Sequence, residues 1–191
     1  MLKWQNFRFL EPVKNKNIIN LIVPNLPMSF IRIKRIEGKE YAYLVENRWY
    51  KRKSRSKGKG PRQKVSKYLG RVYSFNKTNS NEFLNFKNIN DIEQYIRDNN
   101  KNQIIKDLVE WEMFRHNIDG KEFLIDFDNK KVIKNDNKKE VSLKINDGFL
   151  NSYTLGRLIN LKAGNSYYLA KGFVEAGIEI PKEIFVGLFG Q

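Results

Sequence analysis

The basic residues of this chain are concentrated in one segment. Of its 36 Lys and Arg residues, 15 lie between Phe30 and Phe75, where only three acidic residues accompany them. From residue 76 to the end, 17 basic and 17 acidic residues balance each other. The formal charge of +15 therefore belongs chiefly to one segment, and the chain divides into a strongly basic part and a neutral part.

Alternation within the basic segment predicts β-structure. Between Phe30 and Ile36, Ile31 and Ile33 alternate with Arg32 and Lys34, which is typical of a strand with one apolar face. A turn signal follows at residues 37–39, residues 41–45 are strand-like again, and a third strand is expected from about residue 63 to 75. The intervening stretch, residues 51–61, has no apolar side chain and is expected to be a mobile loop or an extended hairpin tip.

The neutral part mixes helical and β patterns. We expect residues 76–88 to be a linker, a helix to start near Asn90 with Glu93 three residues on, and a second helix to follow Asn99 and Asn100. Short strands are expected at 123–127, 131–134 and 140–145. Three further helical patterns are expected: one capped by Asn151 or Ser152, one stopped by Gly177, and one after Pro181.

This order of elements predicts an α+β fold. A small basic antiparallel sheet module comes first, followed by helices, a second short β-meander and C-terminal helices. The chain is accordingly expected to divide into three parts. These are an N-terminal arm or edge strand at residues 1–29, a basic β-module at 30–75, and a mixed helical and β body at 76–191.

Composition excludes several kinds of chemistry. The chain has no cysteine and a single histidine, His116, so thiolate zinc sites, cysteine nucleophiles and histidine-based metal sites are not expected. His116 follows Phe114 and Arg115 near a helix end, where a capping role is favoured over catalysis. We expect no cofactor and no membrane association. The expected location is cytoplasmic, or associated with the nucleoid, or nuclear in a eukaryote.

A charge of this density favours a polyanionic partner, and nucleic acid is the most abundant one. Arginines are suited to base edges and lysines to phosphates, while Trp49 is a candidate for stacking. Tyr41 and Tyr43 are expected to pack against the apolar face of the sheet. The candidate binding residues are Arg32, Lys34, Arg35, Arg48, Trp49, Lys51, Arg52, Lys53, Arg55, Lys57, Lys59, Arg62, Lys64, Lys67 and Arg71.

Three stretches carry a family resemblance: residues 30–34 (FIRIK), 38–46 (GKEYAYLVE) and 62–71 (RQKVSKYLGR). Together they resemble the N-terminal basic β-module of insertion-element transposases of the IS4-like class, over residues 30 to 71. The resemblance implies a small DNA-associated β-module. It does not imply transposase activity, because the long RNase H-like catalytic domain of that class has no room in a chain of this length.

Other functions remain open at this stage. Asp126 and Asp128, with Glu122 and Glu140 nearby, suit a metal-dependent nuclease, although Asp128-Asn129 is equally a turn signal. Residues 153–160 and 166–176 suit a helix-turn-helix, although the second helix carries only Lys171 as a cation. Binding of a protein partner, or of a second copy of the chain, through residues 76–191 is a third class of function. RNA or single strands are alternatives to duplex DNA as the nucleic-acid partner.

The sequence therefore predicts a non-enzymatic DNA-binding protein. Its basic three-strand module and Lys/Arg-rich loop would grip the phosphate backbone, with DNA favoured over RNA because of the resemblance. The neutral body would supply stability or a protein contact.

Overall fold

The structure, a computed structural model, describes residues 29–50, 60–160 and 166–189. Within these residues, seven strands form one mixed sheet and six helices pack beside it, which confirms the α+β class. The order across the sheet is β1-β2-β3-β6-β5-β4, and β7 pairs with β6. The strands are β1 (Ser29–Ile36), β2 (Lys39–Tyr50), β3 (Gly60–Ser74), β4 (Phe123–Asp126), β5 (Lys131–Lys134), β6 (Lys139–Ile145) and β7 (Gly148–Leu150).

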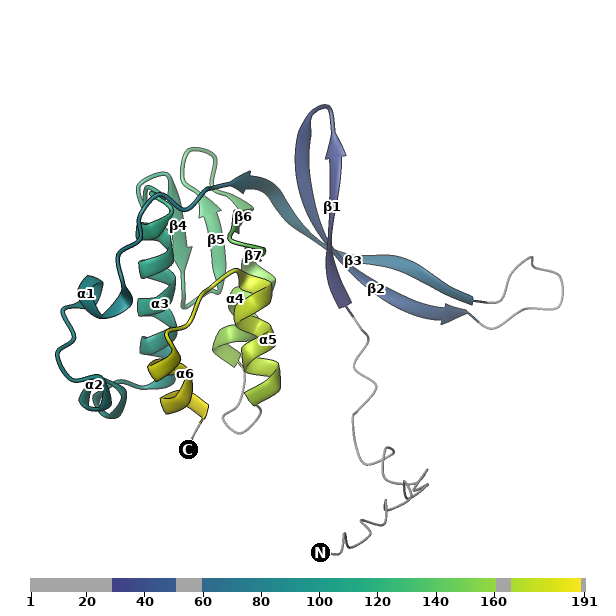
Figure 1. The fold of residues 1–191 in the computed structure, drawn as a ribbon. Coiled ribbons are helices and arrows are strands. Elements are labelled where there is room, and N and C mark those ends of the chain that lie inside the picture. Colours follow the sequence, from purple (N-terminus) through teal and green to yellow (C-terminus); the bar gives the residue numbers. More distant parts are fainter. Residues whose placement is uncertain (1–28, 51–59, 161–165, 190–191) are drawn as a thin grey trace, which may run out of the picture.

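Strands β1, β2 and β3 form an arm that projects away from the helices (Figure 1). β2 lies between β1 and β3 and pairs antiparallel with both, as expected for an antiparallel module. The β1–β2 turn has positive φ angles at Glu37 (49°) and Gly38 (75°), as a type I′ hairpin turn requires. Residues 51–59, expected to be a loop or hairpin tip, and residues 1–28 of the expected N-terminal arm or edge strand lie outside the described residues.

The β2–β3 ladder is interrupted twice. Its register shifts between Ala42 and Tyr43 and again between Leu44 and Val45, so β3 contributes an extra residue at each place. Such bulges bend a strand and increase its right-handed twist. The two long strands curve accordingly (Figure 1), and β1 runs beside the first part of β2, from Lys39 to Glu46.

The arm joins the body through a parallel pairing of β3 with β6. This ladder runs from Arg71 opposite Val141 to Ser74 opposite Lys144. Gly70 stands where the ladder begins; it is buried and has a φ of 100°. A Cβ atom there would lie 2.6 Å from Cα of Val141 and closer still to the carbonyl oxygen of Glu140, so only glycine allows the two strands to approach.

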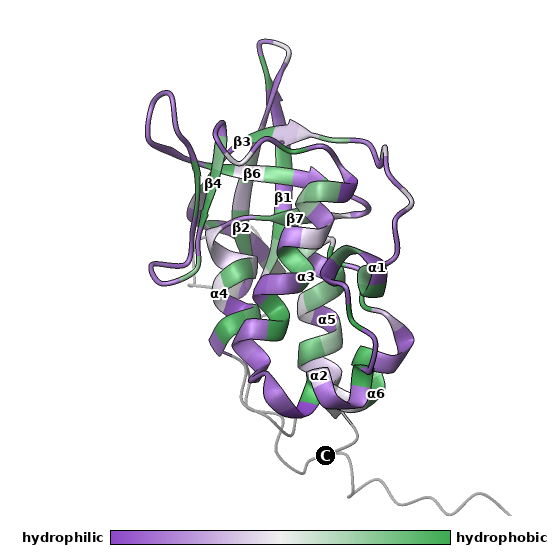
Figure 2. Ribbon diagram, turned by 90° about the vertical axis from the view of Figure 1, so that its left-hand side faces the viewer, coloured by the Kyte–Doolittle hydropathy of each residue, from purple (hydrophilic) through white to green (hydrophobic). Residues whose placement is uncertain are grey.

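Six helices supply most of the remaining core. Figure 2 shows that they gather on one side of the strands and that the α3 and α4 ribbons carry both hydrophobic and hydrophilic positions. None of the helices within the described residues is long and apolar enough to cross a membrane. The helices are α1 (Phe83–Lys87), α2 (Ile92–Asp98), α3 (Lys101–Arg115), α4 (Ser152–Asn160), α5 (Ser166–Ala176) and α6 (Lys182–Phe189).

The helix starts expected from sequence are largely confirmed. Asp91, one residue after Asn90, caps α2 by accepting the backbone N–H groups of residues 93 and 94. Asn100 caps α3 and Asn151 caps α4, the latter through Oδ1. The expected linker at 76–88 was wrong in part, because it contains α1, whose Phe83 is buried against rings from α2 and α3.

A buried polar network closes the C-terminal end of α3. Glu112 is fully buried and accepts hydrogen bonds from the Arg115 guanidinium (2.8 Å) and from the backbone N–H of Glu179 (3.1 Å). Arg115 also pairs with the Glu179 carboxylate (2.7 Å) and lies over the Trp111 ring. His116 is the buried C-cap residue, in agreement with a capping role. The network ties α3 to the segment between α5 and α6.

Candidate nucleic-acid interface

The register of the arm assigns its side chains to two faces. Residues directly opposite one another in a ladder point to the same face of the sheet. One face, called here the core face, carries Ile31, Ile33, Ala42 and Leu44, which pack with Leu69, Val72, Phe149 and Tyr153. The other face, called here the tyrosine face, carries Phe30, Arg32, Lys34, Tyr41, Tyr43, Val45, Val65, Tyr68 and Arg71.

Three tyrosines form the centre of the tyrosine face. The ring of Tyr68 lies 5.3 Å from that of Tyr43 and 6.4 Å from that of Tyr41, measured between centroids. Tyr68 is 51% exposed, and Tyr41 and Tyr43 are half-buried. The expectation that Tyr41 and Tyr43 pack on the apolar face was therefore wrong: β1 pairs them with Lys34 and Arg32, on the opposite side of the sheet.

Cations surround these rings. The Lys34 ammonium lies 5.2 Å from the centroid of the Tyr43 ring, and the Arg71 guanidinium lies 5.0 Å from that of Tyr73. The Arg32 guanidinium donates to the side-chain oxygen of Gln63 at 2.7 Å, across the arm. Burial, with the neighbouring tyrosines, raises the pKa of Tyr68, so its hydroxyl remains a neutral donor. The face thus combines π-surfaces with fixed positive charge.

The acidic residues of the described arm lie elsewhere. Glu40 and Glu46 are on the core face, where they pair with Arg35 (3.9 Å) and Arg48 (2.9 Å). The third, Glu37, is in the β1–β2 turn. Over the described parts of β1, β2 and β3, the tyrosine face consequently carries four cations, Arg32, Lys34, Lys39 and Arg71, and no carboxylate.

The predicted binding residues are therefore divided by the fold. Arg32, Lys34 and Arg71 are brought together on the tyrosine face. The Lys67 ammonium donates to the Ser152 hydroxyl at the start of α4 (3.2 Å). On the core face lie Arg35, Arg48, Arg62 and Lys64. Outside the described residues lie Lys51, Arg52, Lys53, Arg55, Lys57 and Lys59, and the described part of Trp49 is its backbone, paired with Pro61.

A cavity of about 570 Å³ continues the tyrosine face to the junction of arm and body. The arm contributes Tyr41, Tyr68, Arg71 and Tyr73, with Lys67 at its edge, and the body contributes Asn137, Lys139, Glu140 and Val141. Sequence reasoning considered Glu140 only for a nuclease and did not connect any of the body residues with the arm, because the parallel β3–β6 pairing brings them there from 70 residues further along the chain. Tyr68 was recognisable only as one of several aromatics among cations.

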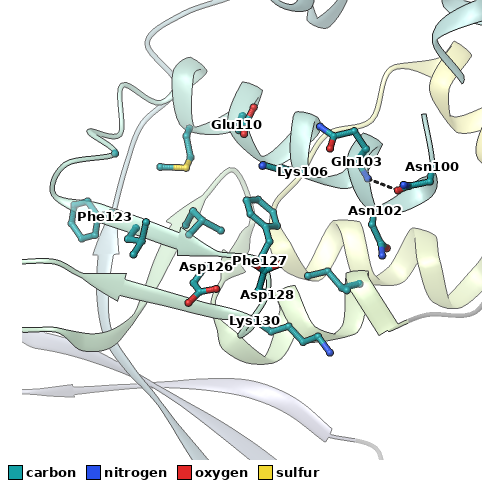
Figure 3. Close-up of a pocket in the computed structure, with 15 residues that line it drawn as sticks. Asn100, Asn102, Gln103, Lys106, Glu110, Phe123, Asp126, Phe127, Asp128 and Lys130 are labelled. Atoms are coloured by element: carbon teal, nitrogen blue, oxygen red, sulfur yellow. Dashed lines mark hydrogen bonds between the residues drawn. The ribbon is translucent and has the colours of Figure 1, made fainter. Parts of the chain in front are cut away.

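The carboxylates considered for a nuclease do not converge. Figure 3 shows Asp126 and Asp128 at the β4–β5 turn, in a cavity whose other wall is α3 with Gln103, Lys106 and Glu110. Asp126 accepts hydrogen bonds from the backbone (2.9 Å) and side-chain (2.8 Å) nitrogens of Asn129, and these bonds lower its pKa. Asp126 thus stabilises the turn. Across the described ranges, no group of three or more His, Cys, Asp or Glu side chains could hold a metal ion.

The helix pair considered for a helix-turn-helix is α4 with α5. Arg157 of α4 forms an ion pair with Glu175 of α5, and Lys171 lies 3.8 Å from the same carboxylate. Tyr167 and Val174 of α5 are 68% and 71% exposed. This pair therefore presents apolar groups and paired charges, which suit phosphate contact poorly.

Comparisons with known protein families, with curated proteins and with solved structures find no match to this chain. The resemblance of residues 30 to 71 to the β-module of IS4-like transposases stays a prediction.

Proposed function

We propose that the chain binds nucleic acid through the tyrosine face of the arm, without catalysing a reaction on it. The observation that supports this most is the sorting of charge: the arm's carboxylates lie on the core face or in a turn, whereas Arg32, Lys34 and Arg71 share one face with three tyrosines. A merely solubilising surface would mix both signs of charge.

The two kinds of side chain have complementary roles. Cations neutralise phosphates and release counterions, which supplies affinity for any nucleic acid. Exposed aromatic rings stack on bases and accept each of them, because every base has a π-face. The six Lys and Arg residues between 51 and 59, which separate β2 from β3 in the sequence, add further positive charge. DNA is favoured over RNA by the resemblance of residues 30 to 71 alone.

Binding of single strands is the second candidate. It is favoured by Tyr68, whose ring is half exposed beside two further tyrosines, because stacking requires a base that is free of its neighbours. Duplex binding would depend more on phosphates and less on the rings.

A titration series tests both candidates. Affinity is measured for a duplex DNA, a DNA single strand and an RNA single strand of equal length, at several salt concentrations, with and without Mg²⁺ and with cleavage monitored. We expect affinity to fall steeply with salt for all three and the strands to remain intact. Weak binding to every probe, or a flat response to salt, would contradict the proposal. Mg²⁺-dependent cleavage that Asp126→Asn abolishes would support a nuclease instead.

A further inference from the structure

The cavity at the junction of arm and body has the composition of a nucleotide site. Its volume of about 570 Å³ lies in the range typical of small-ligand pockets. Three tyrosine side chains line it from β2 and β3, and Arg71 and Lys139 bring positive charge to it from β3 and β6. Aromatic rings beside cations are what a base and its phosphate require.

We infer that this cavity takes one unpaired nucleotide of a nucleic-acid strand that lies along the tyrosine face. The inference rests on the proposed function and adds a substrate class to it: strands with a base that is unpaired or displaced from its stack. The base would lie against Tyr68, and its phosphate against Arg71 and Lys139.

Each of these groups is placed for that role. Tyr68 is 51% exposed and belongs to both the tyrosine face and the cavity, so a strand can pass from one to the other. Lys139 is exposed at the start of β6, and the Arg71 guanidinium is held over the Tyr73 ring at 5.0 Å. Lys67 is a weaker candidate for the phosphate, because its ammonium bonds to Ser152.

Two further groups of the cavity can address the base edge. The side-chain oxygen of Asn137 accepts a hydrogen bond from the backbone N–H of Lys139 at 3.0 Å. The amide nitrogen of Asn137 therefore points away from Lys139 and can donate a hydrogen bond to a base. Glu140 brings a carboxylate, 3.9 Å from the Lys131 ammonium, that accepts hydrogen bonds from amino groups and disfavours a second phosphate. The cavity therefore accommodates one nucleotide better than a continuous backbone.

The test compares two duplex DNAs of the same sequence, one perfect and one with a single bulged 2-aminopurine, whose fluorescence reports stacking. We expect the intact chain to bind the bulged duplex about tenfold more tightly than the perfect one, with a change in fluorescence on binding. Tyr68→Ala should weaken binding of the bulged duplex more than binding of the perfect one and so remove this preference. Tyr68→Phe, which keeps the ring, should retain the preference.

Tyr167→Ala is the matched control, because Tyr167 is also exposed (68%, against 51% for Tyr68) but lies on α5, outside the cavity. Equal affinity of the intact chain for both duplexes, or an equal loss on both in Tyr68→Ala, would overturn the inference and leave the proposed function standing. No binding of either duplex would overturn the inference, and together with weak binding of single strands it would overturn the proposed function as well. Loss of the preference in Tyr167→Ala would also overturn the inference, since it would locate the site elsewhere.

Discussion

The attachment of the arm to the body depends on one glycine, and its replacement has a calculable cost. In Gly70→Ala, two effects add. The positive φ of 100° costs an L-residue roughly 1–2 kcal/mol. The new Cβ would also overlap the backbone of Glu140 and Val141, so β3 and β6 must separate where their ladder begins. Loss of about two hydrogen bonds there costs about 2 kcal/mol more.

Gly38 is a matched control for the cost of the positive φ angle. It also has a positive φ, 75°, but no atom lies within 4 Å of the position that its Cβ would occupy. Gly38→Ala should therefore cost about 1 kcal/mol and Gly70→Ala about 3 kcal/mol or more. For a chain of this length, these costs correspond to decreases in Tm of about 3 °C and about 10 °C.

Urea unfolding followed by circular dichroism, together with thermal melts, measures both variants against the intact chain. The expected result is a loss at Gly70 at least about twice that at Gly38. Equal losses at the two glycines would refute the reasoning, because the close approach of β3 to β6 would then contribute nothing.

Two further predictions concern the stability of the body. Glu112→Ala leaves the buried Arg115 without one of its two carboxylate partners and should lower the free energy of unfolding by about 3–5 kcal/mol, as urea unfolding would show. Glu110→Ala, which removes a half-exposed partner of Lys87, should cost less than about 1 kcal/mol. A loss as large as that of Glu112→Ala would contradict the idea that burial makes the Glu112–Arg115 pair important. Asn151→Ala removes the buried cap of α4 and should cost about 1–2 kcal/mol, whereas a change within error would show that the cap is dispensable.

Local signals in the sequence predicted most of the individual elements. The alternation of Ile31 and Ile33 with Arg32 and Lys34 marked β1, and the turn at Glu37 and Gly38 marked its connection to β2. Asn and Asp clusters marked the turns of the β4–β6 meander and the starts of the helices. These features depend on neighbours within a few residues, so they are visible in the sequence.

The parallel ladder of β3 with β6 had no such signal. Its strands are separated by some 70 residues, and parallel pairing requires no turn residues to join them. The junction cavity follows from that ladder, so Lys139 and Asn137 were not recognised as candidates. The two bulges in β3 were equally invisible, and they determine which face Tyr68 occupies.

The tyrosines show a limit of burial statistics. Tyr41 and Tyr43 alternate with Ala42 and Leu44, so one of the two sets had to face the core. The smaller and more apolar set does so, because Ile31 and Ile33 lie opposite it and Phe149 and Tyr153 of the body cover it. The candidate site could thus be located in the arm from the sequence, but the face of the sheet that carries it could not be predicted.

Two double variants that remove equal charge from opposite faces of the sheet decide whether the tyrosine face is the binding surface. Arg32→Gln with Lys34→Gln alters the tyrosine face, and Arg48→Gln with Lys64→Gln alters the core face. Affinity for one duplex and one single strand is measured as a function of salt. We expect the first pair to reduce the slope of log affinity against log salt by about 1.5–2 and the second pair to reduce it by less than about 0.5. Equal reductions, or a larger one for the core-face pair, would contradict binding through the tyrosine face.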